Sequence, residues 1–211
     1  MKRSTTSAVA VVLVLVLAVV STIAVVGLAT DGANAIEVGD RSVSRKSVND
    51  ELRAIAENKK LANSQGPEGV TVTEGSVKSG VAAALVMSGA VQEALIKEYL
   101  DRKGEHITDA DRAVGKKLFP QTFFGQYAAE FPQWYNDRSR DRLAAYAALA
   151  RVAGIDLQSD TAGDDVASEL RPVAKKAGVT IDPRYGRFVL KNVNVVPYKL
   201  PAGLLPAHPN A

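Results

Sequence analysis

Few residues in this chain are suited to acid–base chemistry. His106 follows Glu105, and a histidine beside a carboxylate can act as a general base. The other histidine, His208, lies near the carboxyl end, and the chain contains no cysteine. The nucleophile, dinucleotide, zinc-protease and phosphate-loop motifs are absent as well. We therefore expect His106 to be a solvated loop residue, and the protein to be non-enzymatic, with no metal or other cofactor.

The remaining charged residues indicate structural roles. Asp164 and Asp165 precede a helical pattern, where carboxylates favour the positive end of the helix dipole. The segment 137–142 alternates in the sign of its charges, which predicts a solvated helix face. The 26 basic and 23 acidic residues leave a net charge of +3. This excess is too small to predict nucleic-acid binding, which needs clustered cations.

A dense block of aromatic residues is the most unusual feature of the sequence. It contains four of the five phenylalanines and the single tryptophan. One interpretation is a core between two helices. The other is a partly exposed apolar surface that binds extended polypeptide, since exposed apolar patches usually bind a partner. The candidate polypeptide-binding residues are Phe119, Phe123, Phe124, Tyr127, Phe131, Trp134 and Tyr135.

The amino-terminal segment predicts export. Lys2 and Arg3 precede an apolar run at 8–29, and the small residues Ala33 and Ala35 follow, as in a secretory signal cleaved after Ala35. The run is also long enough to cross a bilayer, so an uncleaved membrane anchor is the alternative. We favour cleavage because of the small-residue site. Both interpretations place the rest of the chain outside the cytoplasm, secreted or in the cell envelope.

Apolar spacing after residue 35 predicts mainly helices. Ser44 is a candidate N-cap, and Thr108 with Asp111 resembles a capping box. Ala110, Val114 and Leu118 are spaced to form the packed face of one short helix. The expected helices cover residues 45–61, 76–102, 109–118, 133–152 and 164–177.

Short β-like segments occur at both ends of the exported chain. Residues 36–38 and 41–43 flank Gly39-Asp40, which suits a two-residue hairpin. Residues 179–181 and 187–190 form a second expected hairpin, which we expect to join the first in one sheet because a lone hairpin is marginal in water.

These elements predict a mainly α fold. It is a helical bundle of about five helices with a small β-sheet formed by the N- and C-terminal ends of the exported chain. The expected divisions are a signal peptide or anchor at 1–35, a helical domain at 36–196 and a Pro-rich flexible tail at 197–211.

The two ends of the exported chain resemble a known family. The stretch I-E-V-G-D-R-S-V-S-R-K-S-V-N-D-E-L, residues 36–52, resembles the opening of the SurA N-terminal-like domain of exported bacterial chaperones. The stretch G-V-T-I-D-P-R-Y-G-R-F, residues 178–188, resembles the closing strand–turn–strand of single-domain relatives. Many full-length family members carry a parvulin-type prolyl isomerase domain before the last helix. Here residues 158–163 form only a short linker, so the resemblance implies a chaperone without that domain.

Three functions remain open from the sequence. The first is an extracytoplasmic chaperone-like holdase that binds unfolded or extended polypeptides without a cofactor. The second is a membrane-anchored envelope scaffold with one dedicated protein partner. The third is a peptidyl-prolyl isomerase of unrecognised type. The sequence predicts no oligomeric state.

Overall fold

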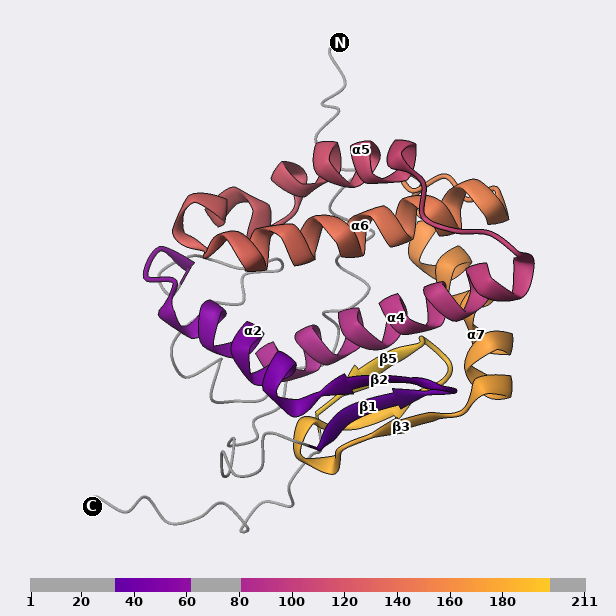
Figure 1. Cartoon of the computed structure of the whole chain (residues 1–211), viewed down its shortest axis with the longest axis horizontal. Coiled ribbons are helices and arrows are strands. Elements are labelled where there is room, and N and C mark those ends of the chain that lie inside the picture. Colours follow the sequence, from indigo (N-terminus) through magenta and orange to yellow (C-terminus); the bar gives the residue numbers. More distant parts are fainter. Residues whose placement is uncertain (1–32, 62–80, 198–211) are drawn as a thin grey trace.

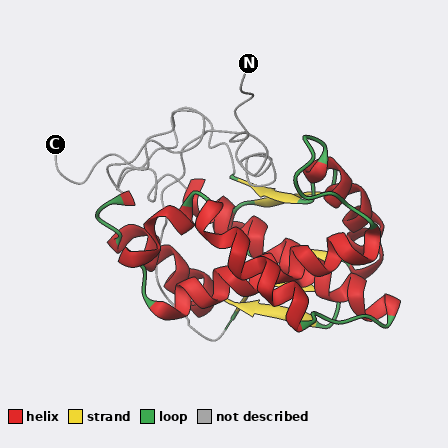
Figure 2. Cartoon of the chain, turned by 90° about the horizontal axis from the view of Figure 1, so that it is seen from above, coloured by secondary structure: helices red, strands yellow, loops and turns green. Residues whose placement is uncertain are grey.

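The computed structural model describes residues 33–61 and 81–197, and its described part is mainly helical, as predicted. The helices α5 and α6 form one layer, α2 and α4 lie beneath it, and the strands lie below α4 (Figure 1). Seen from above, the helices cover part of the strands (Figure 2). No helix within these described ranges has the length and apolar character needed to cross a membrane. The apolar run at 8–29 and most of the predicted tail lie outside the described residues.

The first hairpin and helix follow the prediction closely. Strand β1 (Asn34–Val38) pairs antiparallel with β2 (Arg41–Ser44), with Val38 opposite Arg41. Gly39 has a φ of +56° in the two-residue loop, a conformation that glycine adopts without strain. The Ser44 hydroxyl accepts the Ser47 N–H and caps α2 (Arg45–Glu57). This helix ends before the predicted residue 61 because Asn58 leaves the helical conformation and its side chain accepts the Leu61 N–H.

The sheet confirms that the two ends of the described chain meet. Strand β3 (Val179–Ile181) pairs with β1, which gives the order β2-β1-β3. The predicted second hairpin is wrong, because β4 (Arg187–Val189) pairs with β5 (Asn194–Val196) in a separate sheet. The 3-10 turn η5 (Pro183–Tyr185) and Gly186 redirect the chain between β3 and β4.

Helix α4 (Val81–Lys103) lies at the centre of the hydrophobic core. Two of its polar side chains hold β5 and the turn before it. Ser88 Oγ accepts the Val195 N–H at 2.9 Å, and Gln92 Nε2 donates to the Val193 carbonyl at 2.9 Å. These bonds satisfy buried polar groups, which would otherwise be costly inside an apolar core.

Helices α5 (Asp109–Leu118) and α6 (Gln133–Ala153) pack through a face that differs from the predicted one. The Thr108 capping box is confirmed, but Val114 is 43% exposed. The buried α5 residues are Asp111 and Gly115. A Cβ on Gly115 would lie 2.6 Å from the Ala144 nitrogen of α6. Close backbone approach at glycine, rather than an apolar side-chain stripe, therefore joins these helices.

Helix α7 (Ala162–Ala177) ends at Gly178, as predicted, and continues through Pro172. Pro172 is exposed, and so is Ser168, whose carbonyl loses its helical partner to the proline. Solvent can therefore satisfy that carbonyl, so the proline does not end the helix.

Candidate functional site

The structure divides the predicted aromatic block into interior and surface residues. Phe119, Phe131 and Tyr135 are buried, whereas Trp134 is 44% exposed. The rings of Phe131 and Tyr135 stack with centroids 4.1 Å apart. The remaining members, Phe123, Phe124 and Tyr127, are partly buried and pack against the core.

Short turns hold these rings between α5 and α6. They are η3 (Phe119–Gln121) and η4 (Phe124–Glu130). The Thr122 hydroxyl donates to the Phe119 carbonyl at 2.8 Å and accepts the Gly125 N–H at 2.9 Å. Pro132 then precedes the first residue of α6 in an extended conformation, so that Trp134 and Tyr135 lie in the first helical turn.

Trp134 lines a large open groove. The groove has a volume of about 1210 Å³ and lies between the β2 end of the sheet, α4 and the first half of α6. Strand β2 borders β1 on one side, and within the described residues no strand covers its other side. The groove therefore has a β-strand edge as one wall and an exposed aromatic side chain on the opposite helix.

The groove combines an apolar lining with charged side chains of both signs. Lys97 pairs with Glu93 at 2.6 Å, and Arg41 pairs with Asp101 outside the groove. Its apolar lining residues are Val43, Ala90, Ala94, Ile107, Trp134 and Ala144, and its charged ones are Arg41, Glu93, Lys97, Arg112, Asp137, Arg138 and Asp141.

A buried ion-pair network lies between the groove and a second hollow. Glu51 of α2 is 2% exposed and contacts Arg138 at 2.5 Å and Arg142 at 3.3 Å. Arg142 also contacts Glu93 of α4 at 3.4 Å. The prediction of a fully solvated face at 137–142 is therefore wrong at these two arginines, because the carboxylates of α2 and α4 draw them inward.

Arg142 and Lys97 hold Glu93 in its charged form. Burial alone would raise the pKa of Glu93, but Arg142 and Lys97 outweigh it, so this pKa lies below its usual range. The neighbouring Tyr146 and Tyr135 are neutral, since burial raises the pKa of each phenol well above its ordinary value.

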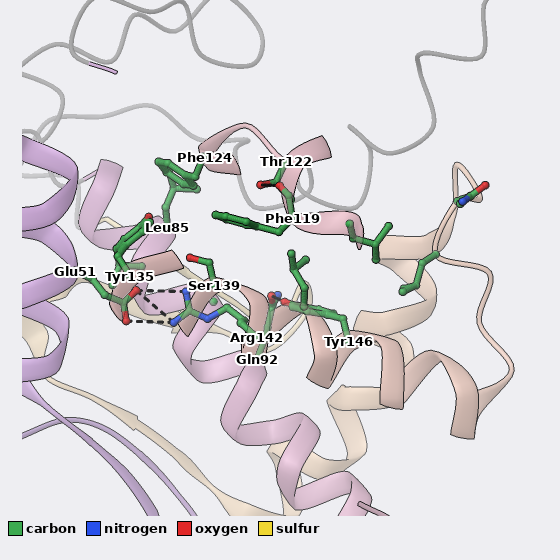
Figure 3. Close-up of a pocket in the computed structure, with 16 residues that line it drawn as sticks. Glu51, Leu85, Gln92, Phe119, Thr122, Phe124, Tyr135, Ser139, Arg142 and Tyr146 are labelled. Carbon is green, nitrogen blue, oxygen red and sulfur yellow. Dashed lines mark hydrogen bonds and ion pairs between the residues drawn. The ribbon is translucent and has the colours of Figure 1, made fainter. Parts of the chain in front are cut away.

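The second hollow lies on the other side of the network. It has a volume of about 140 Å³. Phe119 and Phe124 lie on one side of it, with Ser139 and Arg142 of α6 on the other (Figure 3). Several of the remaining lining residues are aliphatic: Leu85, Val86, Leu118, Leu143 and Leu157.

Among the described residues, those singled out for acid–base potential take part in structural contacts. Glu105 pairs with Arg151 at 3.0 Å, and the backbone carbonyl of exposed His106 accepts from the same arginine. Asp165 accepts from Thr161 in the first turn of α7. In the ranges 33–61 and 81–197, no group of three or more potential metal ligands lies close together.

The predicted cleavage motif lies within the folded part of the chain. Ala35 belongs to β1 and is 1% exposed. The Ala33 carbonyl accepts the Arg45 N–H at 2.9 Å, and the Ala35 carbonyl accepts the Asp182 N–H at 2.9 Å. Cleavage after Ala35 would remove these bonds and begin the chain at buried Ile36.

Comparison with family models, curated proteins and solved structures found no match for this chain. The candidate sites of this chain are therefore the groove and the second hollow, with the ion-pair network between them. The sequence predicted Trp134 as a binding residue. It did not predict the groove or the buried ion pairs of Glu51, because both depend on contacts between distant elements.

Proposed function

We propose that this protein is an extracytoplasmic, chaperone-like polypeptide-binding protein without enzymatic activity. Its binding site is the groove between β2, α4 and the first half of α6. The observation that carries the proposal is the outer edge of β2, which no strand of the described residues covers, in a groove large enough to hold an extended peptide. Export is an inference from the amino-acid pattern of residues 1–35.

The β2 edge supplies recognition that does not depend on sequence. In an antiparallel pair, alternate residues direct their N–H and C=O groups away from the partner strand. An extended peptide can pair with these groups by adding one strand to the sheet. Because every peptide carries the same backbone, this mode suits a protein that accepts many unfolded segments.

The apolar lining adds side-chain contacts. Trp134 supplies a large, partly exposed ring, and Val43 and Ile107 add smaller apolar surfaces. Aromatic rings lose little conformational entropy on binding and dominate many interfaces. Because the groove carries charges of both signs, it favours neither acidic nor basic segments.

A dedicated envelope scaffold is the second candidate. The specific observation in its favour is the buried position of Ala35, which argues for an amino-terminal segment that stays attached to the domain. A scaffold would bind one partner sequence in the same groove, so the range of accepted peptides separates the two candidates.

The single tryptophan provides a direct assay. Trp134 is the only tryptophan of the chain, so its fluorescence reports on the groove. The full chain in detergent is titrated with tryptophan-free, ten-residue extended peptides of three unrelated sequences. We expect a saturable blue shift with all three. Analogues N-methylated at every second residue should bind at least tenfold more weakly, since methylation removes the donors that a β2 edge requires.

Controls separate the groove from other surfaces. Trp134→Ser is followed by peptide fluorescence anisotropy and should weaken binding, while Val114→Ser, at an equally exposed position outside the groove, should not. Binding of only one peptide would favour the scaffold. No binding of any peptide, or equal binding of the methylated analogues, would refute the edge-strand proposal. Catalysed cis–trans conversion of a proline peptide would contradict the absence of enzymatic activity.

A further inference from the structure

We infer that the second hollow, between α4, α6 and the η3–η4 segment, binds a small neutral aromatic molecule. This site is separate from the groove and does not depend on the proposed function. The hollow and its lining side chains are shown in Figure 3.

The size of the hollow limits the ligand. Its volume is about 140 Å³, and an apolar protein cavity of about 150 Å³ holds one benzene molecule. A single aromatic ring with small substituents therefore fits. A nucleotide or a sugar chain would not fit.

Three polar side chains of the lining, those of Tyr146, Gln92 and Thr122, are already paired inside the protein. The Tyr146 hydroxyl donates to Gln92, whose amide donates to the Val193 carbonyl at 2.9 Å. The Thr122 hydroxyl donates to the Phe119 carbonyl at 2.8 Å. A strongly polar ligand would lose its hydration without gaining these partners, which disfavours its burial.

The charge of the lining is also balanced. Arg142 contacts both Glu51 and Glu93, so the guanidinium has no carboxylate partner to gain from a ligand. A carboxylate ligand would have to compete with both glutamates, and a cationic ligand would face Arg142 itself. A neutral ligand meets neither penalty.

The hollow favours an aromatic ligand over an aliphatic one. The Arg142 side chain lies across from Phe119 and Phe124 in the hollow (Figure 3). A ring held between them contacts aromatic edges or faces on one side and a guanidinium on the other. The aromatic rings and the guanidinium both interact favourably with the quadrupole of the ligand ring.

Leucines that are only partly buried also line the hollow. They are Leu85, Leu143 and Leu157. Apolar side chains that remain in contact with water gain from an apolar ligand that covers them.

The test is a thermal-shift measurement on the full chain in detergent, with benzene, cyclohexane and benzoate as probes. At a free benzene concentration fivefold above Kd, we expect Tm to rise by about 2–4 °C. Cyclohexane should bind about threefold more weakly, and benzoate at least tenfold more weakly. Benzene should leave the binding of a groove peptide unchanged, which distinguishes failure of this site from failure of the groove.

Filling the hollow provides the structural control. Leu143→Trp places a ring in the hollow and should abolish the benzene shift, whereas Val114→Trp on α5 should retain it. Leu157→Trp serves the same purpose if Leu143→Trp does not fold. A benzene shift that survives a folded filling variant, or the absence of any saturable shift in the wild-type chain, would overturn the inference.

Discussion

Replacement of Arg142 by methionine tests the buried network that joins α2, α4 and α6. The guanidinium contacts Glu51 at 3.3 Å and Glu93 at 3.4 Å, and its side chain is 17% exposed. Removing one partner of a buried ion pair costs about 3–5 kcal/mol. Here Glu51 retains Arg138 at 2.5 Å and Glu93 retains Lys97 at 2.6 Å. We therefore expect a smaller loss, about 2–3 kcal/mol of unfolding free energy.

The pH dependence of this loss identifies its origin. The lowered pKa of Glu93 contributes stability above pH 4.5, the ordinary glutamate value, and this contribution is lost as the pH falls through the folded-state pKa. Arg142 is a principal cause of the lowering, so Arg142→Met should lose most of this contribution. The stability difference between wild type and variant should therefore shrink in acid.

Urea unfolding followed by circular dichroism, at pH 7 and at pH 3, measures both effects. The matched control is Arg53→Met on α2, whose side chain is 61% exposed and lies 3.8 Å from Asp50. Exposed pairs of this kind contribute about 0–1 kcal/mol. Equal stability of Arg142→Met and Arg53→Met at pH 7, or a loss that is the same at both pH values, would refute this account of the network.

Three further predictions concern packing, titration and processing. Gly115→Ala should lower the unfolding free energy by about 1–2 kcal/mol in urea titrations, because the clash with α6 outweighs the helix-propensity gain. Tyr135 and Tyr146 should resist ionisation above pH 10 in absorbance titrations, and the stability held by their raised pKa values should be lost as the pH rises from 10 toward the folded-state values. A chain lacking residues 1–35 should be less stable by about 2 kcal/mol than one lacking 1–32, because it exposes strand bonds and places a charged amino group at a buried position.

Each of these predictions has a contradicting result. A stabilising Gly115→Ala would mean that α5 can move away from α6, and Ala113→Gly, at an exposed α5 position, is its control. Ionisation of all tyrosines near pH 10 in the folded chain would contradict the burial of the two phenols. Equal stability of the two truncated chains in urea titrations would contradict the processing prediction.

Local signals in the sequence predicted local structure well. The caps at Ser44 and Thr108 depend on bonds between residues three positions apart, so their residue types alone were sufficient. The Gly39-Asp40 turn and the stop at Gly178 are local in the same sense. The association of β1 with β3 was also predictable, since neither end forms a stable sheet alone.

Contacts between distant residues were not predictable in this way. The packed face of α5 depends on the α6 backbone near Gly115, which no apolar spacing reveals. The placement of β5 against α4 includes a bond from Val195 to Ser88, more than a hundred positions earlier in the chain. Arg138 and Arg142 looked solvated because their partner Glu51 lies on another helix. The groove and the second hollow are products of these same distant contacts.

The pairing of β1 with β3 also limits when the three-stranded sheet can be completed. The central strand of the sheet is contributed by the first described residues, and its partner Ile181 is among the last. In a chain that emerges from its amino end, β1 and β2 are present early, but one edge of β1 has no partner until β3 follows. Contacts this far apart slow folding, and open edges promote association between chains. A nascent copy of this protein is therefore itself an unfolded segment with an unpaired strand until nearly its whole length has appeared.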